Sequence, residues 1–308
     1  MRQDDRRSPR LGYALAAAAA ALWALNGSLA RFLLDDGLAA SRLAQLRSLI
    51  SFLILAFALA ALRPDLLRVR RKDLGRLALF GIGGLALVHA TYFYAITRLQ
   101  IGVALVLEYL APLLVLIWLR VRHGRDLPGR LWSAVALSVA GCFLVVEAYD
   151  AGALDSLGVA AALGAAVAFA IYLVTGERAG HRYAPATTLV WGFGFASLFW
   201  AVATPLWSFP VELLRSGENI ALALGVALVG TLIPFACMVE ALRHIPAARA
   251  SIVATLEPVL AALLAWVIHD EALSAPQLVG GALVVAAVIW VQAQGPTLAS
   301  EKAPPFGG

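Results

Sequence analysis

The stretch SIVATLEPVLAALLAWVIHDE, from Ser251 to Glu271, decides the fold of this chain. It is almost wholly apolar, yet it holds one carboxylate, Glu257, directly before Pro258. A charged side chain at the centre of a bilayer costs about 2.5–3.5 kcal/mol on insertion scales, so such residues are rare and usually functional. The stretch therefore predicts a membrane-spanning helix that carries a functional acid.

A second stretch, in the first half of the chain, matches this one. When the numbering is shifted by 146, LVLEYLAPLLVLIWLR (Leu105–Arg120) aligns with it, and Pro112 falls on Pro258. This segment also contains a single acid, Glu108. The same ungapped shift places Gly84 on Gly230 and aligns further glycines and aromatic residues along the half-chain. We infer an internal duplication, in which each half has one acid in a membrane helix.

Composition places the protein in a membrane. Hydrophobic residues make up 61% of the chain and charged residues 14%, whereas soluble domains are about 25% charged. The net charge is +5, but the basic residues occur in short clusters between apolar runs, a pattern that sets membrane orientation and does not indicate nucleic-acid binding. The expected fold is an all-α polytopic membrane protein.

About 20 apolar residues span a bilayer as a helix. This rule predicts ten transmembrane helices, at residues 11–33, 41–62, 74–96, 102–120, 130–148, 157–178, 186–208, 219–242, 248–268 and 276–294. They form two five-helix repeats, 11–148 and 157–294, between tails at 1–10 and 295–308. Because five is odd, the second repeat enters the membrane from the opposite side. Such inverted repeats are typical of secondary transporters, which bind substrate near the bilayer midplane.

The distribution of charge predicts the orientation. Nineteen of the 24 Lys and Arg residues fall in the two tails and in the loops after even-numbered spans, when the ends of the spans that flank these loops are included. The densest cluster is RPDLLRVRRKDLGR (Arg63–Arg76), while the opposite side carries mainly acids. Positive charge is retained on the cytoplasmic side, so both termini are expected in the cytoplasm of a plasma or inner membrane protein.

Four segments carry a family resemblance over roughly residues 11–294: ALWALNGSLA in the first span, Arg47 in the second, GTLIPFACMVEALRHIPAARASIVATLEPVLAALLAWVIHDEAL across the eighth and ninth, and PQLVGGALVVAAVIWVQ in the tenth. They resemble the EamA family of the drug/metabolite transporter superfamily. The most specific piece is Glu257–Pro258 followed by an apolar helix and Glu271. The chain departs from the pattern at Asp270, where the family commonly has Gly.

This resemblance implies ten helices in two repeats, with a substrate site walled by helices 1, 3, 4, 6, 8 and 9. It implies a small-molecule substrate, and the segment ALVLEYLAPLL resembles the branch that contains amino-acid exporters. We therefore expect export of a small organic metabolite, such as an amino acid, by alternating access. The chain has no nucleotide-binding motif, and we expect neither a cofactor nor a metal. Membrane lipid and protons are the other expected partners, and the oligomeric state stays open.

The two acids are the first site candidates. Glu257 is expected to carry a proton or bind a cation, and the alternative is a structural acid paired with a buried Arg or with a helix end. Glu108 lies three residues before Ala111, the repeat equivalent of Glu257. Residues at i and i+3 share a helix face, so pseudo-symmetry directs both acids toward the same central space. Proton coupling through either acid is a further hypothesis.

The remaining candidates have structural alternatives. A simple kink is the favoured interpretation of Pro112 and Pro258, and a freed carbonyl facing the substrate is the alternative. Arg47 is expected either to contact substrate or to be a snorkelling residue or the partner of an acid in a structural ion pair. Polar and aromatic groups suited to walls of an apolar cavity form the last set, each of which could instead be a satisfied core residue: Trp23, Asn26, Tyr172, His89 and Tyr92.

Two other classes of function fit the residues less well. A membrane-embedded enzyme or lipid-handling protein would need a metal constellation or a nucleophile beside a base. The five His residues are scattered along the chain, which argues against that class. A purely structural subunit would not explain two symmetry-related acids in membrane helices.

Overall fold

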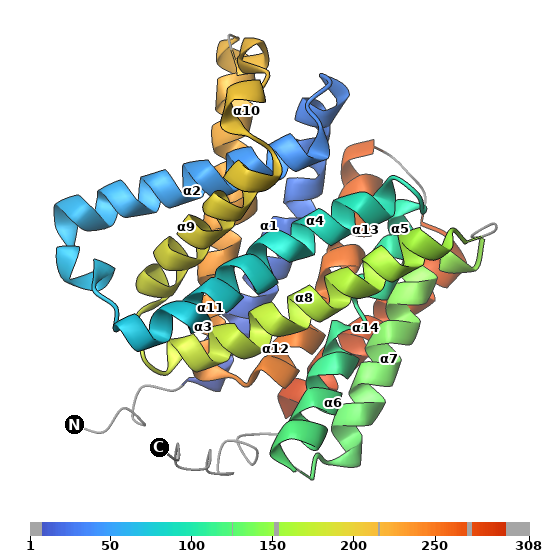
Figure 1. Cartoon of the computed structure of the whole chain (residues 1–308). Coiled ribbons are helices and arrows are strands. Elements are labelled where there is room, and N and C mark those ends of the chain that lie inside the picture. Colours follow the sequence, from blue (N-terminus) through green and yellow to red (C-terminus); the bar gives the residue numbers. More distant parts are fainter. Residues whose placement is uncertain (1–7, 125, 151–153, 215, 270–272, 294–308) are drawn as a thin grey trace.

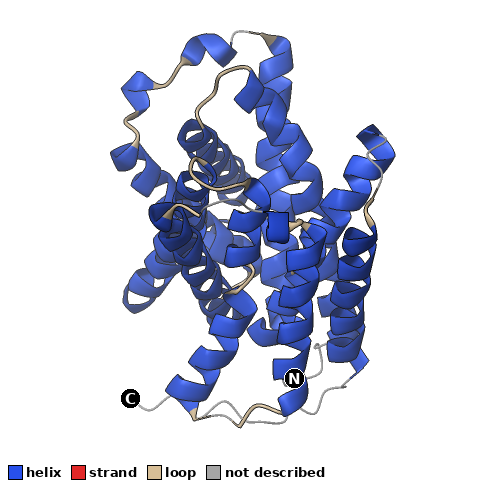
Figure 2. Cartoon of the chain, turned by 90° about the vertical axis from the view of Figure 1, so that its right-hand side faces the viewer, coloured by secondary structure: helices blue, strands red, loops and turns tan. Residues whose placement is uncertain are grey.

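The computed structural model describes residues 8–124, 126–150, 154–214, 216–269 and 273–293, and every regular element in these ranges is a helix (Figures 1 and 2). The predicted all-α class is confirmed. Within the described ranges, eight helical segments are long and apolar enough to cross a membrane. The predicted spans 11–33 and 130–148 are not among these eight and correspond to helices of 27 and 17 residues. The total of ten spans stays a prediction.

The first half of the chain consists of helices α1 (Pro9–Asp35), α2 (Ala40–Leu62), α3 (Leu74–Ala78), η4 (Leu79–Ala86), α4 (Leu87–Ile96), α5 (Ile101–Glu108), α6 (Ala111–His123) and α7 (Gly129–Val145). Short turns are η2 (Pro64–Leu67), η3 (Arg71–Asp73) and η5 (Ala148–Asp150). The predicted tails lie outside the described residues at 1–7 and 295–308, as do Asp270 and Glu271.

The second half consists of helices α8 (Ser156–Gly180), α9 (Pro185–Ala203), α10 (Gly217–Ala227), η8 (Leu228–Leu232), α11 (Ile233–His244), α12 (Ala247–Ala254), α13 (Leu256–His269) and α14 (Ala275–Ala293). Two short turns, η6 (Leu206–Ser208) and η7 (Val211–Leu214), follow α9. The described residues of the two halves therefore present the same order of long elements.

The fourth and ninth predicted spans are interrupted helices. We expected a kink at each proline, but α5 ends at Glu108 and α12 ends at Ala254 before a new helix starts. Each of these last residues lies four positions before a proline, Pro112 or Pro258. A proline has no N–H to donate to the carbonyl four residues earlier, and its ring clashes with that carbonyl. The first helix in each span therefore ends at the residue whose carbonyl cannot accept a hydrogen bond from the proline.

The irregularities of the two halves fall at matching positions. At the shift of 146, α5 and α6 (101–123) coincide with α12 and α13 (247–269) in their first and last residues. Two π-helical segments, η4 and η8, likewise end at equivalent residues, Ala86 and Leu232. π-Helical turns are rare and frequent at functional sites, so their repetition at matching positions is informative.

Packing follows the same correspondence. The helix α1 packs on α11, and its equivalent α8 packs on α4. The helices α7 and α14, which are equivalents, pack on each other, as do α2 and α9. In Figure 1, α8 and α4 run side by side across the front. Elements of one half are therefore covered mainly by elements of the other.

Glycine permits two equivalent close approaches between the halves. A Cβ on Gly84 would lie 2.9 Å from the Cα of Tyr172, and a Cβ on Gly230 would collide with the side-chain oxygen of Asn26. Since Asn26 and Tyr172 are themselves equivalents at the shift of 146, one contact type is used twice. The absence of a side chain at both glycines thus permits close helix packing.

The loops gather at two opposite ends. At one end Ser8 N–H donates to His244 Nδ1 (3.2 Å), Gly180 abuts Arg243, and Tyr183 bonds Asp73. These are the beginning of α1 and the loops after the even-numbered predicted spans, where the basic residues cluster. Many large apolar side chains of the helices are exposed, as expected for a surface that faces lipid.

Candidate functional site

Glu257 lies in the first turn of α13, where the second interrupted helix resumes. Its Oε2 accepts a hydrogen bond from the Tyr109 hydroxyl at 2.6 Å. Tyr109 is buried and lies in the interruption between α5 and α6. The positive end of a helix dipole stabilises a negative charge. The helix start and the Tyr109 hydroxyl therefore both favour a charged Glu257.

Glu108 is the last residue of α5 and therefore lies at a helix C-terminus, whereas Glu257 lies near a helix N-terminus. Its carboxylate makes no hydrogen bond or ion pair with a residue in the described ranges. It lies close enough to Glu257 for the two charges to interact. The Tyr92 hydroxyl is close enough to interact electrostatically with both carboxylates. The structure thus brings the two predicted acids together, with only one of them directly bonded.

Arg47 is buried on α2 and is held by the π-helical turn of the other half. Its Nε donates to Thr231 Oγ1 at 2.8 Å and its Nη2 donates to the Gly230 carbonyl at 3.0 Å. Within the described part of the chain it forms no ion pair with either acid, although its charge acts on Glu257. Arg47 therefore supplies positive potential to the acid pair from a fixed position.

Among the described residues, one ring nitrogen of His89 has a hydrogen-bond partner and the other has none. Its Nδ1–H donates to the Leu85 carbonyl at 2.7 Å, which leaves Nε2 as the acceptor of a neutral ring. The ring packs near Phe93 and Phe235. In the ranges that the structure describes, no group of three or more His, Cys, Asp or Glu residues is placed to hold a metal ion.

Trp23 and Tyr172 belong to an aromatic cluster around Phe235. Trp23 meets Phe235 edge to face with ring centroids 5.3 Å apart, and Tyr172 meets the same ring at 5.3 Å. Two buried polar atoms beside this cluster, Tyr172 Oη and Asn26 Oδ1, have no hydrogen-bond partner among the described residues. A buried group without a partner costs about 1–3 kcal/mol, so both atoms are suited to a polar group that arrives with a substrate.

Two residues of the arrangement were missed from the sequence. They are Tyr109, which bonds Glu257, and Thr231, which bonds Arg47. The available signal for Tyr109 was a polar hydroxyl next to Glu108 in an apolar helix. Thr231 follows Gly230 in a run that is otherwise apolar.

Comparison with known proteins defines the class. The model of the EamA-like transporter family matches residues 10–147 and again residues 156–292. The threonine/homoserine exporter RhtA of Escherichia coli strain K12 is 29% identical over 236 residues, which cover 74% of this chain and 75% of that protein. The uncharacterized inner membrane transporter YicL of Salmonella typhimurium strain LT2 is 26% identical over 291 residues, covering 92% of this chain and 96% of that protein.

A solved crystal structure shows the same fold. It superposes with a TM-score of 0.78 at 20% sequence identity and covers 94% of this chain and 99% of the other. The apolar helices and these matches define an integral membrane protein of the transporter class. Within that class, the chain belongs to the EamA-like transporter family. The predicted family is confirmed, and the family is made up of transporters.

Proposed function

We propose that this chain is a secondary transporter that exports a small organic metabolite, such as an amino acid, by alternating access of two inverted repeats. The observation that carries the proposal is the pair of matched helix interruptions, which bring Glu108 and Glu257 within reach of each other's charge. Interrupted membrane helices form substrate and ion sites in many transporters, because their free ends offer polar groups and dipoles inside the membrane.

An amino acid fits the chemistry of this centre. A charged Glu257 offers an acceptor for the substrate ammonium group, and charge-assisted hydrogen bonds of this kind are about twice as strong as neutral ones. Arg47 and the Tyr172 hydroxyl supply positive charge and a donor for the substrate carboxylate. The name of the RhtA relative, a threonine/homoserine exporter, supports the same substrate class.

Glu108 is proposed as the coupling residue. Two nearby carboxylates repel each other when both are charged, so a proton on Glu108 relieves the repulsion with Glu257. A substrate ammonium group neutralises the pair in the same way. Proton and substrate therefore compete for the acids, which gives exchange of an entering proton for a departing substrate.

The inverted repeats and the orientation are supported by separate observations. Matching helix interruptions, π-helical turns and packing partners support the two repeats at 11–148 and 157–294. The basic loops that lie together at one end support a cytoplasmic location for that end and for both termini in a plasma or inner membrane.

The test uses purified protein and reconstituted vesicles. Thermal stabilisation by a panel of amino acids and other metabolites is measured for the native chain and for Glu257→Gln and Glu108→Gln, followed by efflux of each stabilising compound. Glu240→Gln is the matched control, because Glu240 pairs with Arg243 near the end of α11, away from the acid pair. We expect an amino acid to stabilise the native chain and the control but not Glu257→Gln. Equal stabilisation of all four proteins would refute a substrate site at the acids.

A further inference from the structure

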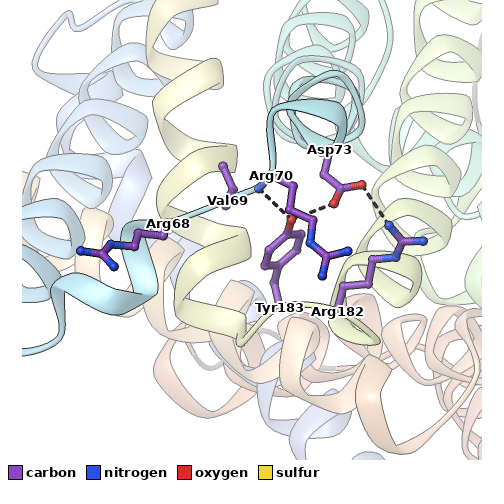
Figure 3. A pocket seen from close by; sticks show the side chains of 6 residues that line it. All are labelled: Arg68, Val69, Arg70, Asp73, Arg182 and Tyr183. Carbon is purple, nitrogen blue, oxygen red and sulfur yellow. Dashed lines mark hydrogen bonds and ion pairs between the residues drawn. The ribbon is translucent and has the colours of Figure 1, made fainter.

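A pocket of about 630 Å³ lies at the basic end of the molecule, away from the acid pair. Figure 3 shows its lining, which consists of Arg68, Val69, Arg70, Asp73, Arg182 and Tyr183. The first four belong to the connection between α2 and α3, and the last two to the connection between α8 and α9. The proposed transport cycle assigns no role to this pocket.

The walls of the pocket are fixed by hydrogen bonds from the second half of the chain. The Tyr183 hydroxyl donates to Asp73 Oδ2 at 2.8 Å and accepts the backbone N–H of Arg70 at 3.2 Å. On α9, Thr187 Oγ1 donates to the Leu66 carbonyl at 2.7 Å and Trp191 Nε1 donates to the Leu67 carbonyl at 3.1 Å. The loop is therefore held in one shape before any ligand arrives.

The charge inside the pocket is unbalanced. The lining contains three arginines and one aspartate, which gives it a net charge of +2, and the Arg68 guanidinium points away from Asp73 in Figure 3. Asp73 is buried and already paired with Arg76 at 3.0 Å and Arg182 at 3.1 Å. The Arg70 side chain has no hydrogen bond or ion pair with a described residue, and its guanidinium points toward the same space as that of Arg182. Two like charges in one pocket favour an anion between them.

Another arginine of the same loop, Arg63, has its guanidinium group hydrogen-bonded within the chain. Arg63 donates to Asp65 from both Nε and Nη2, at 3.2 Å and 3.1 Å. That hydrogen bond holds the pKa of the exposed Asp65 carboxyl below its usual value. Arg63 therefore has an anion supplied by the chain itself, whereas Arg70 has none among the described residues.

The surroundings of the pocket favour an amphipathic anion. The side chains of Phe57 and Leu62, on the last turns of α2, are 71% and 77% exposed and directly precede the basic loop. Exposed apolar groups at the end of a membrane helix, next to a basic loop, mark the boundary between acyl chains and headgroups. A ligand with an anionic head and an apolar tail matches such a boundary.

We propose that this pocket binds the phosphate of an anionic phospholipid headgroup, held between the guanidinium groups of Arg70 and Arg182. Arginine pairs with phosphate through two parallel hydrogen bonds, and basic pockets between membrane helices bind anionic headgroups in this way. The same chemistry suits a free phosphate ion, so the experiment separates the two sources.

The experiment measures lipid retention by native mass spectrometry and thermal stabilisation of the purified full chain. The probes are phosphatidylglycerol, phosphatidylcholine, glycerol 3-phosphate and inorganic phosphate. The test variant is Arg70→Gln, in which the backbone N–H bonded to Tyr183 is kept. The matched control is Arg71→Gln, which removes the same charge from the same loop but outside the pocket lining.

We expect phosphatidylglycerol to bind the native chain more tightly than phosphatidylcholine. Arg70→Gln should weaken phosphatidylglycerol binding about twentyfold. The control should weaken it by no more than about fivefold, through the general attraction of a basic loop to an anionic surface. Without lipid, both variants should melt at the native temperature, which separates a lost ligand from a damaged fold.

Three results would overturn the proposal. Equal weakening by Arg70→Gln and Arg71→Gln would leave only diffuse attraction and no defined site. Equal retention of phosphatidylglycerol and phosphatidylcholine would show that the negative headgroup is not recognised. Stabilisation by inorganic phosphate or glycerol 3-phosphate, with no further gain from the lipid, would assign the pocket to a soluble phosphate.

Discussion

The two interrupted helices have nearly the same backbone and different chemistry. In the first half, Glu108 ends α5, where the helix dipole disfavours negative charge, and it has no hydrogen-bond partner among the described residues. In the second half, Glu257 lies in the first turn of α13, where the dipole favours negative charge, and it accepts a short hydrogen bond from the Tyr109 hydroxyl. The surroundings therefore favour a negative charge at Glu257 more than at Glu108.

The residues around the acids explain how the halves diverged. At the shift of 146, the equivalent of Tyr109 is Thr255, whose hydroxyl bonds the carbonyl of its own helix at Ile252. The equivalent of Arg47 is Phe193, a buried apolar residue. The hydrogen bond from the Tyr109 hydroxyl and the positive charge of Arg47 thus both act on Glu257. A nearly symmetric backbone with different side chains therefore gives the two acids different surroundings.

The largest effect is expected from Glu257→Gln. Removing the charge takes away the proposed acceptor for the substrate ammonium, and substrate binding should weaken about thirtyfold or more. Binding measured by calorimetry and efflux from vesicles test the change. Native affinity in Glu257→Gln would break the comparison, since Glu257 would then be structural.

Glu108→Gln should have a smaller and different effect. The amide cannot take up a proton, so efflux should lose its response to an imposed pH gradient and fall about tenfold. Substrate binding should change less than in Glu257→Gln. The measurement is vesicle efflux with and without the gradient, and a preserved gradient response would remove Glu108 from the coupling step.

Tyr109→Phe sharpens the comparison by removing the bond that only Glu257 has. A hydrogen bond to a charged group contributes about 1.5–3 kcal/mol, part of which other donors can replace. We expect substrate affinity to fall about fivefold, with the melting temperature little changed. Thr255→Val is the equivalent substitution in the second half, and it should leave the affinity unaltered. Equal effects of the two variants would contradict an assignment of the hydroxyl to Glu257.

The smallest effect on transport is expected from Gly84→Ala and Gly230→Ala, which test the equivalent close contacts. A Cβ at Gly84 meets the backbone of Tyr172, whereas a Cβ at Gly230 meets the end of the Asn26 side chain. Backbone cannot yield as a side chain can, so Gly84→Ala should destabilise more, within the range of about 1–3 kcal/mol for overpacking. Thermal unfolding in detergent gives the order, and the reverse order would contradict it.

Much of the fold could be predicted from hydropathy and the shift of 146. These gave the helical class and the positions of the spans, since apolar length alone determines where a chain crosses a bilayer. The interruptions at Pro112 and Pro258 could not be separated from kinks. Whether a proline bends a helix or ends it depends on what surrounds the freed carbonyl, and that is a property of the packed neighbours.

The candidate site was predictable in its charged residues and not in its partners. An acid such as Glu257 is conspicuous because a bilayer penalises it. Its bond with Tyr109 joins residues 148 positions apart in sequence, and the contact of Arg47 with Thr231 joins residues 184 apart. Both contacts depend on how the halves dock, and π-helical turns such as η8 leave no composition signal that the sequence analysis could use.

The packing of α7 on α14 and of α2 on α9 has a consequence for how the chain is assembled. In a dimer of identical subunits, an element that contacts its own copy lies on the twofold axis of an isologous interface. Each of these helix pairs joins an element to its equivalent, so one polypeptide contains the contacts of a two-subunit complex. The covalent joint falls between η5 and α8. Two separately synthesised pieces, divided at that joint, would still have the surfaces through which subunits recognise each other.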